Sequence, residues 1–219
     1  VNVDPAFSTN KVTGGATNVP VGQFTMKAYG EDVKVNTLRV NFATTTINTL
    51  NNVSLYVNGG QVGTSQNFTV AAATTGYLEY TLGSSLVIPA NSTVTLTVKA
   101  DIVDGSNAAY TSGSVAAKIG GATNNAQGQS SNELINVANS VVTGNTLTVS
   151  SGAGSFARTS GFTTVSVAPN TANVKIGSFT LQADSSEDIR VTSVEVKPAV
   201  TTYAITNLSN LTVKSNGMA

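Results

Sequence analysis

The residues best suited to chemistry in this chain are a few acidic side chains beside predicted turns. They form two adjacent pairs and one spaced pair: Glu31–Asp32, Glu187–Asp188, and Asp101 with Asp104. Carboxylate oxygens are the ligands that Ca²⁺ prefers, so each place is a candidate calcium site. The alternative is a turn whose carboxylate accepts hydrogen bonds from backbone N–H groups. Because the spacing matches no EF-hand loop, we prefer the turn and assign no metal-binding residue.

Other chemistry lacks its usual residues. The chain has no Cys and no His, which removes the common ligands of zinc and haem and excludes Ser-His and Cys-His catalysis. Paired carboxylates serve glycoside hydrolysis, but no aromatic-lined sugar cleft is indicated. The glycine clusters at 13–15 and 58–60 lack the GxxxxGK[ST] pattern and indicate turns, not phosphate loops. We therefore predict no catalytic residue, no cofactor-binding residue and no cofactor, and expect that the chain is not an enzyme.

Length and composition limit the partners. At 219 residues, one or two domains are expected. Charged residues make up only 10%, and 11 Lys+Arg balance 11 Asp+Glu, so the surface is polar through Thr, Ser and Asn. Nucleic acid binding requires a basic face, which is missing. No apolar run approaches the roughly 18 residues of a membrane span, so no membrane insertion is expected. Val1 is not an initiator Met, so we expect that the start has been cut or processed.

The elements that would position these residues are strands. Residues 92–100 alternate strictly, with Val and Leu on one face and Thr on the other. Helix is nearly absent, and its one weak candidate, 132–139, could equally be a strand. The composition of 120–131 predicts a flexible surface loop. Further strands are predicted near 19–28, 33–42, 53–57, 68–72, 77–82, 114–119 and 146–149.

A long internal repeat organises the chain. The first copy, Asn18–Gly59, begins NVPVGQFTMKAYG-EDVKVNTLRVNF, and the second copy, Asn173–Gly217, begins NVKIGSFTLQADSSEDIRVTSVEVKP. The two lie 155 to 158 residues apart, and such a period predicts a tandem array of similar domains. Both copies also shift their inward-facing phase twice, first beside Gly22 and Gly177, then between Val35 and Leu38 and between Val191 and Val194. Each shift predicts a β-bulge or a strand that changes sheets.

Many short strands separated by Gly, Asn and Pro turns indicate an antiparallel β-sandwich. We expect a first domain at 1–145 and a second, partial repeat at 146–219. The first copy is followed by further strands, whereas the second ends at Ala219, which would leave apolar faces and open edges exposed. Three explanations stay open: a fragment of a longer array, completion by strand addition from another subunit, or a smaller domain sharing only the first strands.

The segments VGQFTMKAYGEDVKVNTLRVNF, LNNVSLYVNGGQVG and LVIPANSTVTLTVKADI together resemble immunoglobulin-like repeat modules of large secreted bacterial surface proteins, of the surface-layer, adhesin-stalk and fibre types. The resemblance covers most of 19–103 and returns at 173–217. It implies tandem immunoglobulin-like β-sandwich domains in a non-catalytic, extracellular protein at the cell surface. No anchoring segment is recognisable.

We therefore expect a structural protein that polymerises with copies of itself, as a self-assembling subunit of a surface layer or filament. Strand donation between subunits is the sharper form of this hypothesis. The alternative is an adhesin-type binding module that recognises a glycan or host protein through loops at one end of the sandwich. Contact with a cell wall or glycan is a further partner left open.

Overall fold

The computed structural model describes residues 1–70, 76–152, 154–163, 166–183, 188–197 and 208–215. These ranges contain strands, turns and irregular segments and no helix, so the predicted all-β class is confirmed. Accordingly, no helix that could cross a membrane is found within them. Contacts divide the chain into Val1–Asp188 and Ile189–Ala219, and each part is described by itself.

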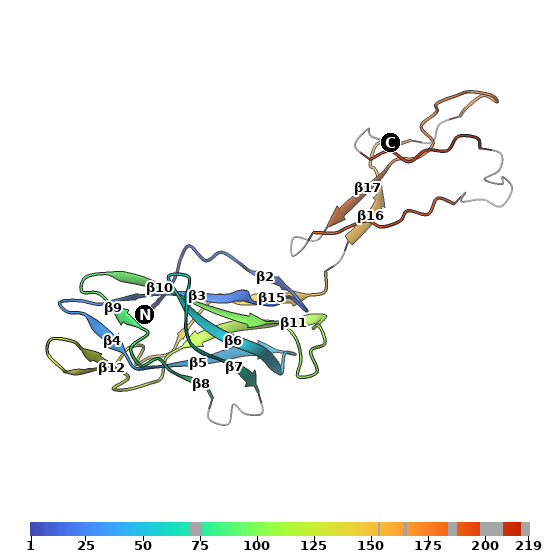
Figure 1. Ribbon diagram of the computed structural model, residues 1–219. Coiled ribbons are helices and arrows are strands. Elements are labelled where there is room, and N and C mark those ends of the chain that lie inside the picture. The colour runs from blue at the N-terminus through green and yellow to red at the C-terminus, as the bar shows by residue number, and fades with distance from the viewer. Residues whose placement is uncertain (71–75, 153, 164–165, 184–187, 198–207, 216–219) are drawn as a thin grey trace. The chain divides into compact units, whose positions relative to one another are not determined.

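The first sheet is antiparallel and gathers strands from distant parts of the sequence (Figure 1). Its central strand, β10, pairs with β3 on one edge and with β6 on the other. The order across this sheet is β1 (Asn2–Val3), β3 (Val19–Lys27), β10 (Thr93–Asp101), β6 (Thr49–Val57) and β7 (Gly60–Thr69).

The second sheet is antiparallel except for one pair, β2 and β15, which run parallel. Because β15 also pairs with β11, and its Leu147 and Val149 are buried, this strand packs into the first sandwich. The expected boundary after residue 145 falls inside this sheet, so the strand placed at the start of the second domain pairs with the first. The division into two domains stays a prediction. The order is β2 (Lys11–Thr13), β15 (Leu147–Ser150), β11 (Ser112–Ile119), β5 (Thr37–Thr45) and β8 (Leu78–Thr81), with β14 (Val142–Thr143) beside β11.

A third, small sheet corrects the expectation for 120–131 and decides between the two alternatives, helix and strand, at 132–139. The segment expected to be a flexible loop contains β12, and the side chain of Asn125 beside it is buried and bonds to the carbonyls of Thr37 and Val137. The weak helix candidate at 132–139 contains the short strand β13. The order is β13 (Leu134–Ile135), β12 (Ala126–Gly128), β4 (Val33–Val35) and β9 (Val87–Ile88). Polar side chains that bond to the backbone fix this segment, which composition alone did not indicate.

The core lies between the inward faces of the two larger sheets. In β10 the apolar residues from Val94 to Ala100 are buried and the threonines between them are half-buried or exposed, which confirms the predicted alternation. The neighbouring strand β3 contributes Phe24 to the same cluster, and β5 and β11 of the second sheet contribute Leu38 and Val115. Burial of each such side chain contributes about 1.5–3 kcal/mol. The arrangement is consistent with the predicted β-sandwich, and we call residues 2–150 the sandwich.

The first phase shift is a β-bulge. Val98 lies opposite Gly22 and the next residue of β10 lies opposite Pro20, so Val21 is the extra residue. Val21 and Gly22 are consequently both buried, side by side. Only glycine fits here, because a Cβ on Gly22 would lie 2.7 Å from the Cβ of Ala117.

The second phase shift is a change of sheet. β4 ends at Val35 in the small third sheet, and β5 begins at Thr37 in the second sheet. Backbone N–H groups of Asn36 and Thr37 both donate to the carbonyl of Asn125 at the crossing. The same sequence signal therefore has two structural causes in one copy.

Beyond the sandwich, β16 (Gly154–Arg158) and β17 (Phe179–Ala183) form a separate antiparallel pair. β17 begins at Phe179, the counterpart of Phe24 in β3. β16 corresponds to β1, because Arg158 lies opposite Phe179 as Val3 lies opposite Phe24. The repeat thus extends upstream of the first copy to the start of the chain.

Local backbone structure repeats with the same spacing of 155 residues. The turn bond from the N–H of Phe7 to the carbonyl of Asp4 has its counterpart from Phe162 to Thr159. Asn18 and Asn173 both adopt a left-handed conformation, with φ of 53° and 57°. Only a few residue types adopt this conformation readily, so these matches indicate that both stretches encode the same path.

In the part Ile189–Ala219, the described residues 189–197 and 208–215 form no extended strand. Asn210 has φ 56°, as its counterpart Asn52 has φ 51° in β6. The large apolar residues that are described in this part are exposed: Ile189, Val191, Val194, Val196, Leu208, Leu211 and Val213.

Candidate functional site

The first acidic pair holds neighbouring loops in place. The carboxylate of Glu31 accepts hydrogen bonds from the Ser131 hydroxyl at 2.6 Å and from the N–H groups of Ser130 and Ser131 at 2.7 and 2.9 Å. The hydroxyl bond is the largest cause that lowers the pKa of Glu31, followed by the two N–H bonds. Asp32 accepts from the N–H of Ala90 at 2.8 Å. The carboxylates thus accept hydrogen bonds from backbone N–H groups, but these groups lie 58 to 100 positions away and not in the same turn.

Asp101 and Asp104, the spaced pair, also accept hydrogen bonds. Asp104 accepts from the hydroxyl and N–H of Ser106 and from the N–H of Ala108, and the Ser106 hydroxyl contributes most to its lowered pKa. The two oxygens of Asp101 accept from the N–H of Asn18 and from the Asn52 amide, each at 2.6 Å. Sequence reasoning missed this role of Asp101, which ties the start of β3 to β6.

The candidate calcium sites do not converge. Within the described ranges, no three acidic side chains gather at a distance that would suit one metal ion. Asp188 is exposed, and Glu187 lies outside the described residues. Whether calcium binds at Glu31–Asp32 or at Asp101 and Asp104 stays untested.

The tyrosines that bear on the adhesin alternative make contacts inside the sandwich. Tyr80 is buried and donates to the carbonyl of Val53 at 2.7 Å. The Tyr110 hydroxyl bonds to Thr49, and the rings of Tyr56 and Tyr77 lie beneath Lys99 and Arg39. These rings are used in packing.

The feature with the clearest functional meaning is the apolar surface of the second copy. Positions that are buried in the first copy, at 0–7% exposure, are 38–60% exposed in the second. The matched positions are Val21 and Ile176, Phe24 and Phe179, Met26 and Leu181, Val33 and Ile189, Val35 and Val191, Leu38 and Val194, Val40 and Val196, Leu50 and Leu208, Val53 and Leu211, and Leu55 and Val213. The sequence prediction of exposed apolar faces in the second copy agrees with this pattern.

The two-stranded sheet has one apolar face. Phe156 lies opposite Leu181, so both side chains stand on the same face as Phe179, whose ring stacks on that of Phe156 at 5.0 Å between centroids. All residues of both strands are exposed. An isolated pair of strands is marginal in water, so this face requires a covering layer.

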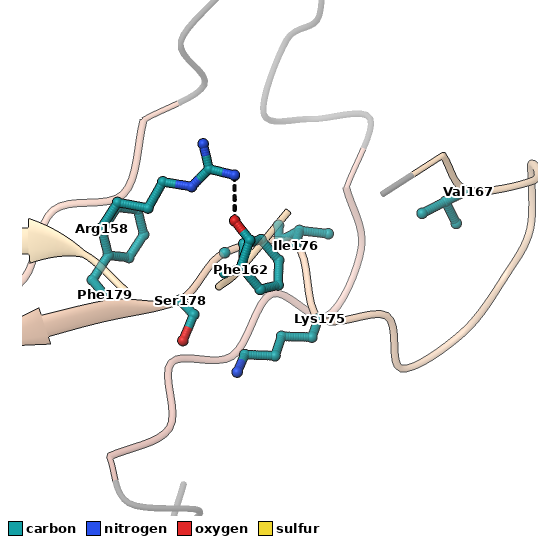
Figure 2. Close-up of a pocket in the computed structure, with 8 residues that line it drawn as sticks. Arg158, Phe162, Val167, Lys175, Ile176, Ser178 and Phe179 are labelled. Atoms are coloured by element: carbon teal, nitrogen blue, oxygen red, sulfur yellow. Dashed lines mark hydrogen bonds between the residues drawn. The ribbon is translucent and has the colours of Figure 1, made fainter. Parts of the chain in front are cut away.

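An open pocket of about 300 Å³ lies at the end of this pair (Figure 2). Phe162, Val167 and Ile176 line it, with Arg158 and Lys175 on either side of the Phe162 ring. Figure 2 shows the Arg158 guanidinium directed at the Phe162 carbonyl, to which it donates a hydrogen bond.

The first copy shows what fills the corresponding space. The counterparts of the apolar pocket residues, Phe7, Val12 and Val21, belong to the core. The carbonyl of Phe7 accepts a hydrogen bond from Asn145, and β15 pairs beside Val12. The pocket therefore marks the place where the second sheet covers the first in the sandwich.

One signal in the sequence was overlooked. Phe7 and Phe162, and Val12 and Val167, share the spacing of 155 residues and lie upstream of the first copy. With Thr9 and Thr164 these are three identical pairs among mostly dissimilar neighbours, a weak pattern that extends the repeat together with the matched turn.

Searches among protein-family models, curated proteins and solved structures found no match to this chain.

Proposed function

We propose that this chain is a non-catalytic, extracellular structural protein: a self-assembling subunit of a cell-surface layer or filament. In this proposal it consists of tandem immunoglobulin-like domains, and a neighbouring subunit completes the second one by donating a strand. The single observation that carries the proposal is the exposure, in the described part of the second copy, of ten positions whose counterparts form the core in the first.

The physical argument is the cost of that exposure. Covering one large apolar side chain contributes about 1.5–3 kcal/mol, and Phe156, Phe179 and Leu181 are gathered on one face. Exposed contiguous apolar surface of this kind marks an interaction site. Among the described residues, β16 and β17 each have one edge without a partner strand, and these edges add backbone groups that a further strand would satisfy.

The surface chemistry of the sandwich fits a material that persists outside the cell. Charged residues are few and balanced, so contacts between subunits would use neutral hydrogen bonds of Thr, Ser and Asn. Salt screens such contacts little. The absence of Cys and His from the sequence supports a structural role over a catalytic one.

Sedimentation velocity and negative-stain microscopy of the full chain test the proposal. We expect ordered filaments or sheets from the native chain and their loss in Leu181→Ser. Leu134→Ser is the matched control, because Leu134 is a leucine of the sandwich with 61% exposure against 48% for Leu181. A native chain that stays monomeric at high concentration contradicts self-assembly. A monomer that binds a defined oligosaccharide on a glycan array would support the adhesin alternative.

A further inference from the structure

Within the described residues, the edge of β17 that faces away from β16 has no partner strand. Its counterpart β3 is paired on both edges, by β1 and by β10. Because β16 takes the place of β1, the open edge of β17 is the one that β10 occupies in the first copy.

The pairing of β10 with β3 shows which chemistry this edge accepts. Val94 lies opposite Met26 and Leu96 opposite Phe24, and all four side chains are buried. Thr95, between them, faces the other side of the sheet. The strand that covers this edge therefore alternates apolar residues with threonine.

The second copy presents the same alternation on β17. Phe179 and Leu181 stand on the apolar face, and Thr180 and Gln182 stand on the polar face. Thr180 is identical to its counterpart Thr25, and Leu181 replaces Met26 by a side chain of similar volume.

The close approach of a glycine and a phenylalanine ring is also repeated at the end of this edge. A Cβ on Gly177 would lie 3.1 Å from the Phe179 ring, against 3.2 Å between Gly22 and the Phe24 ring. The aromatic ring thus lies over the glycine in both copies. In the first copy this is the position of the β-bulge, where β10 has no residue opposite Val21 of β3.

A polar contact completes the arrangement in the first copy. Oδ1 of Asp101, at the end of β10, accepts a hydrogen bond from the N–H of Asn18 at 2.6 Å. Asn173 has the same left-handed conformation as Asn18. In the part of the chain that the structure describes, the N–H of Asn173 makes no hydrogen bond.

We propose that the open edge of β17 binds, antiparallel, an extended segment of a separate polypeptide in which apolar residues alternate with threonine and which ends in an aspartate. Its apolar side chains lie opposite Phe179 and Leu181, and its aspartate accepts a hydrogen bond from the N–H of Asn173. This inference rests on the proposed function and specifies the donated strand by its chemistry and register.

The register is specific because strand side chains alternate. A slip of one residue would place threonines on the apolar face and apolar residues in water. The backbone hydrogen bonds supply affinity that any extended peptide shares, whereas the alternating side chains select the partner.

Fluorescence anisotropy with a labelled peptide tests the proposal on the full chain. The probe has the sequence of Ser92–Ile102, which contains the whole of β10. We expect saturable binding to the native chain and at least about tenfold weaker affinity for Leu181→Thr. The leucine side chain becomes buried when the peptide binds, and this burial contributes at least about 1.4 kcal/mol, which corresponds to a factor of ten in affinity. Leu134→Thr, in the sandwich, should bind as the native chain does.

Two peptide variants test the register and the carboxylate. A peptide in which Val94 exchanges places with Thr95, and Leu96 with Thr97, shifts the apolar phase by one residue and should bind at least about tenfold more weakly. A peptide with Asp101→Asn should bind about threefold to tenfold more weakly, because a charged carboxylate accepts a stronger hydrogen bond than a neutral amide does.

Hydrogen exchange locates the bound peptide. We expect new protection in residues 178–183 and none in residues 19–27. No binding, equal affinity for Leu181→Thr and the native chain, or protection confined to 19–27 would each overturn the proposal.

The two proposals fail in different ways. If the chain binds the peptide but forms no ordered assemblies, the proposed strand binding at the open edge of β17 is supported and the proposed function in self-assembly is contradicted. If the chain forms assemblies that depend on Leu181 but binds no peptide, the proposed function is supported and the proposed strand binding at the open edge of β17 is contradicted.

Discussion

The matched phenylalanines of the two copies give the sharpest test of the structure. Phe24 is fully buried, and its ring contacts the backbone at Gly22 and Gly144. Replacing a buried phenylalanine by alanine removes its transfer free energy and leaves a cavity between the sheets, so Phe24→Ala should lower the free energy of unfolding by about 3–5 kcal/mol. Phe24→Leu keeps most of the volume and should cost less than about 2 kcal/mol.

The equivalent change in the second copy should leave the sandwich unaffected. Phe179 is 60% exposed, and its nearest ring partner is Phe156 of the adjacent strand. Phe179→Ala should therefore change the unfolding free energy of the sandwich by less than about 0.5 kcal/mol. It should nevertheless weaken assembly, since the apolar face loses its largest residue.

Urea unfolding followed by tyrosine fluorescence measures both variants, because the buried Tyr80 reports on the sandwich. The midpoint should move for Phe24→Ala, while the dependence of the free energy on urea stays constant. Equal losses for Phe24→Ala and Phe179→Ala would refute the reasoning, because Phe179 would then be buried in the same cooperative core.

Two further outcomes follow from individual contacts. The contacts that lower the pKa of Glu31 contribute stability above its unfolded pKa of 4.5, and this stability is lost as the pH falls through the folded pKa. Thermal unfolding of Glu31→Gln should therefore show a smaller loss of stability on acidification than the native chain does. An unchanged dependence of stability on pH would contradict the contact with Ser131. Gly14→Ala should lower the free energy of unfolding in urea by about 1–3 kcal/mol, because its Cβ would overlap the Tyr110 carbonyl. Gly60→Ala, whose Cβ has its nearest contact at 3.6 Å, should change it by less than about 0.5 kcal/mol. Equal effects of the two substitutions would contradict this difference in packing.

Much of the fold is encoded in local alternation. Strands such as β10 bury one face and expose the other, so the period of two in their sequence marks the core directly. The phase shifts were likewise visible, but their nature was not. A bulge at Val21 and a change of sheet at Asn36 alter the inward parity in the same way, and only the partner strands distinguish them.

Features that depend on distant polar contacts were not predictable. The segment 120–131 has the composition of a loop, yet Glu31 and the buried amide of Asn125 hold it in a sheet. The pairing of β15 with β2 joins residues more than a hundred positions apart, and no short-range pattern reports such a pairing. Asp104 caps its own turn, as the sequence indicated, but Asp101 lies at the end of β10, and its link to Asn18 and Asn52 required coordinates.

The parallel ladder between β2 and β15 determines how the sandwich would respond to tension. Thr148, Val149 and Ser150 lie beside Lys11, Val12 and Thr13, and both strands point the same way. A pull on the amino-terminal side of β2 and on the carboxyl-terminal side of β15 would slide the strands past one another, so their hydrogen bonds would have to break together and not in sequence. Single-molecule stretching should accordingly show a lower rupture force when Thr148→Pro removes the N–H that donates to the carbonyl of Asn10 in this ladder.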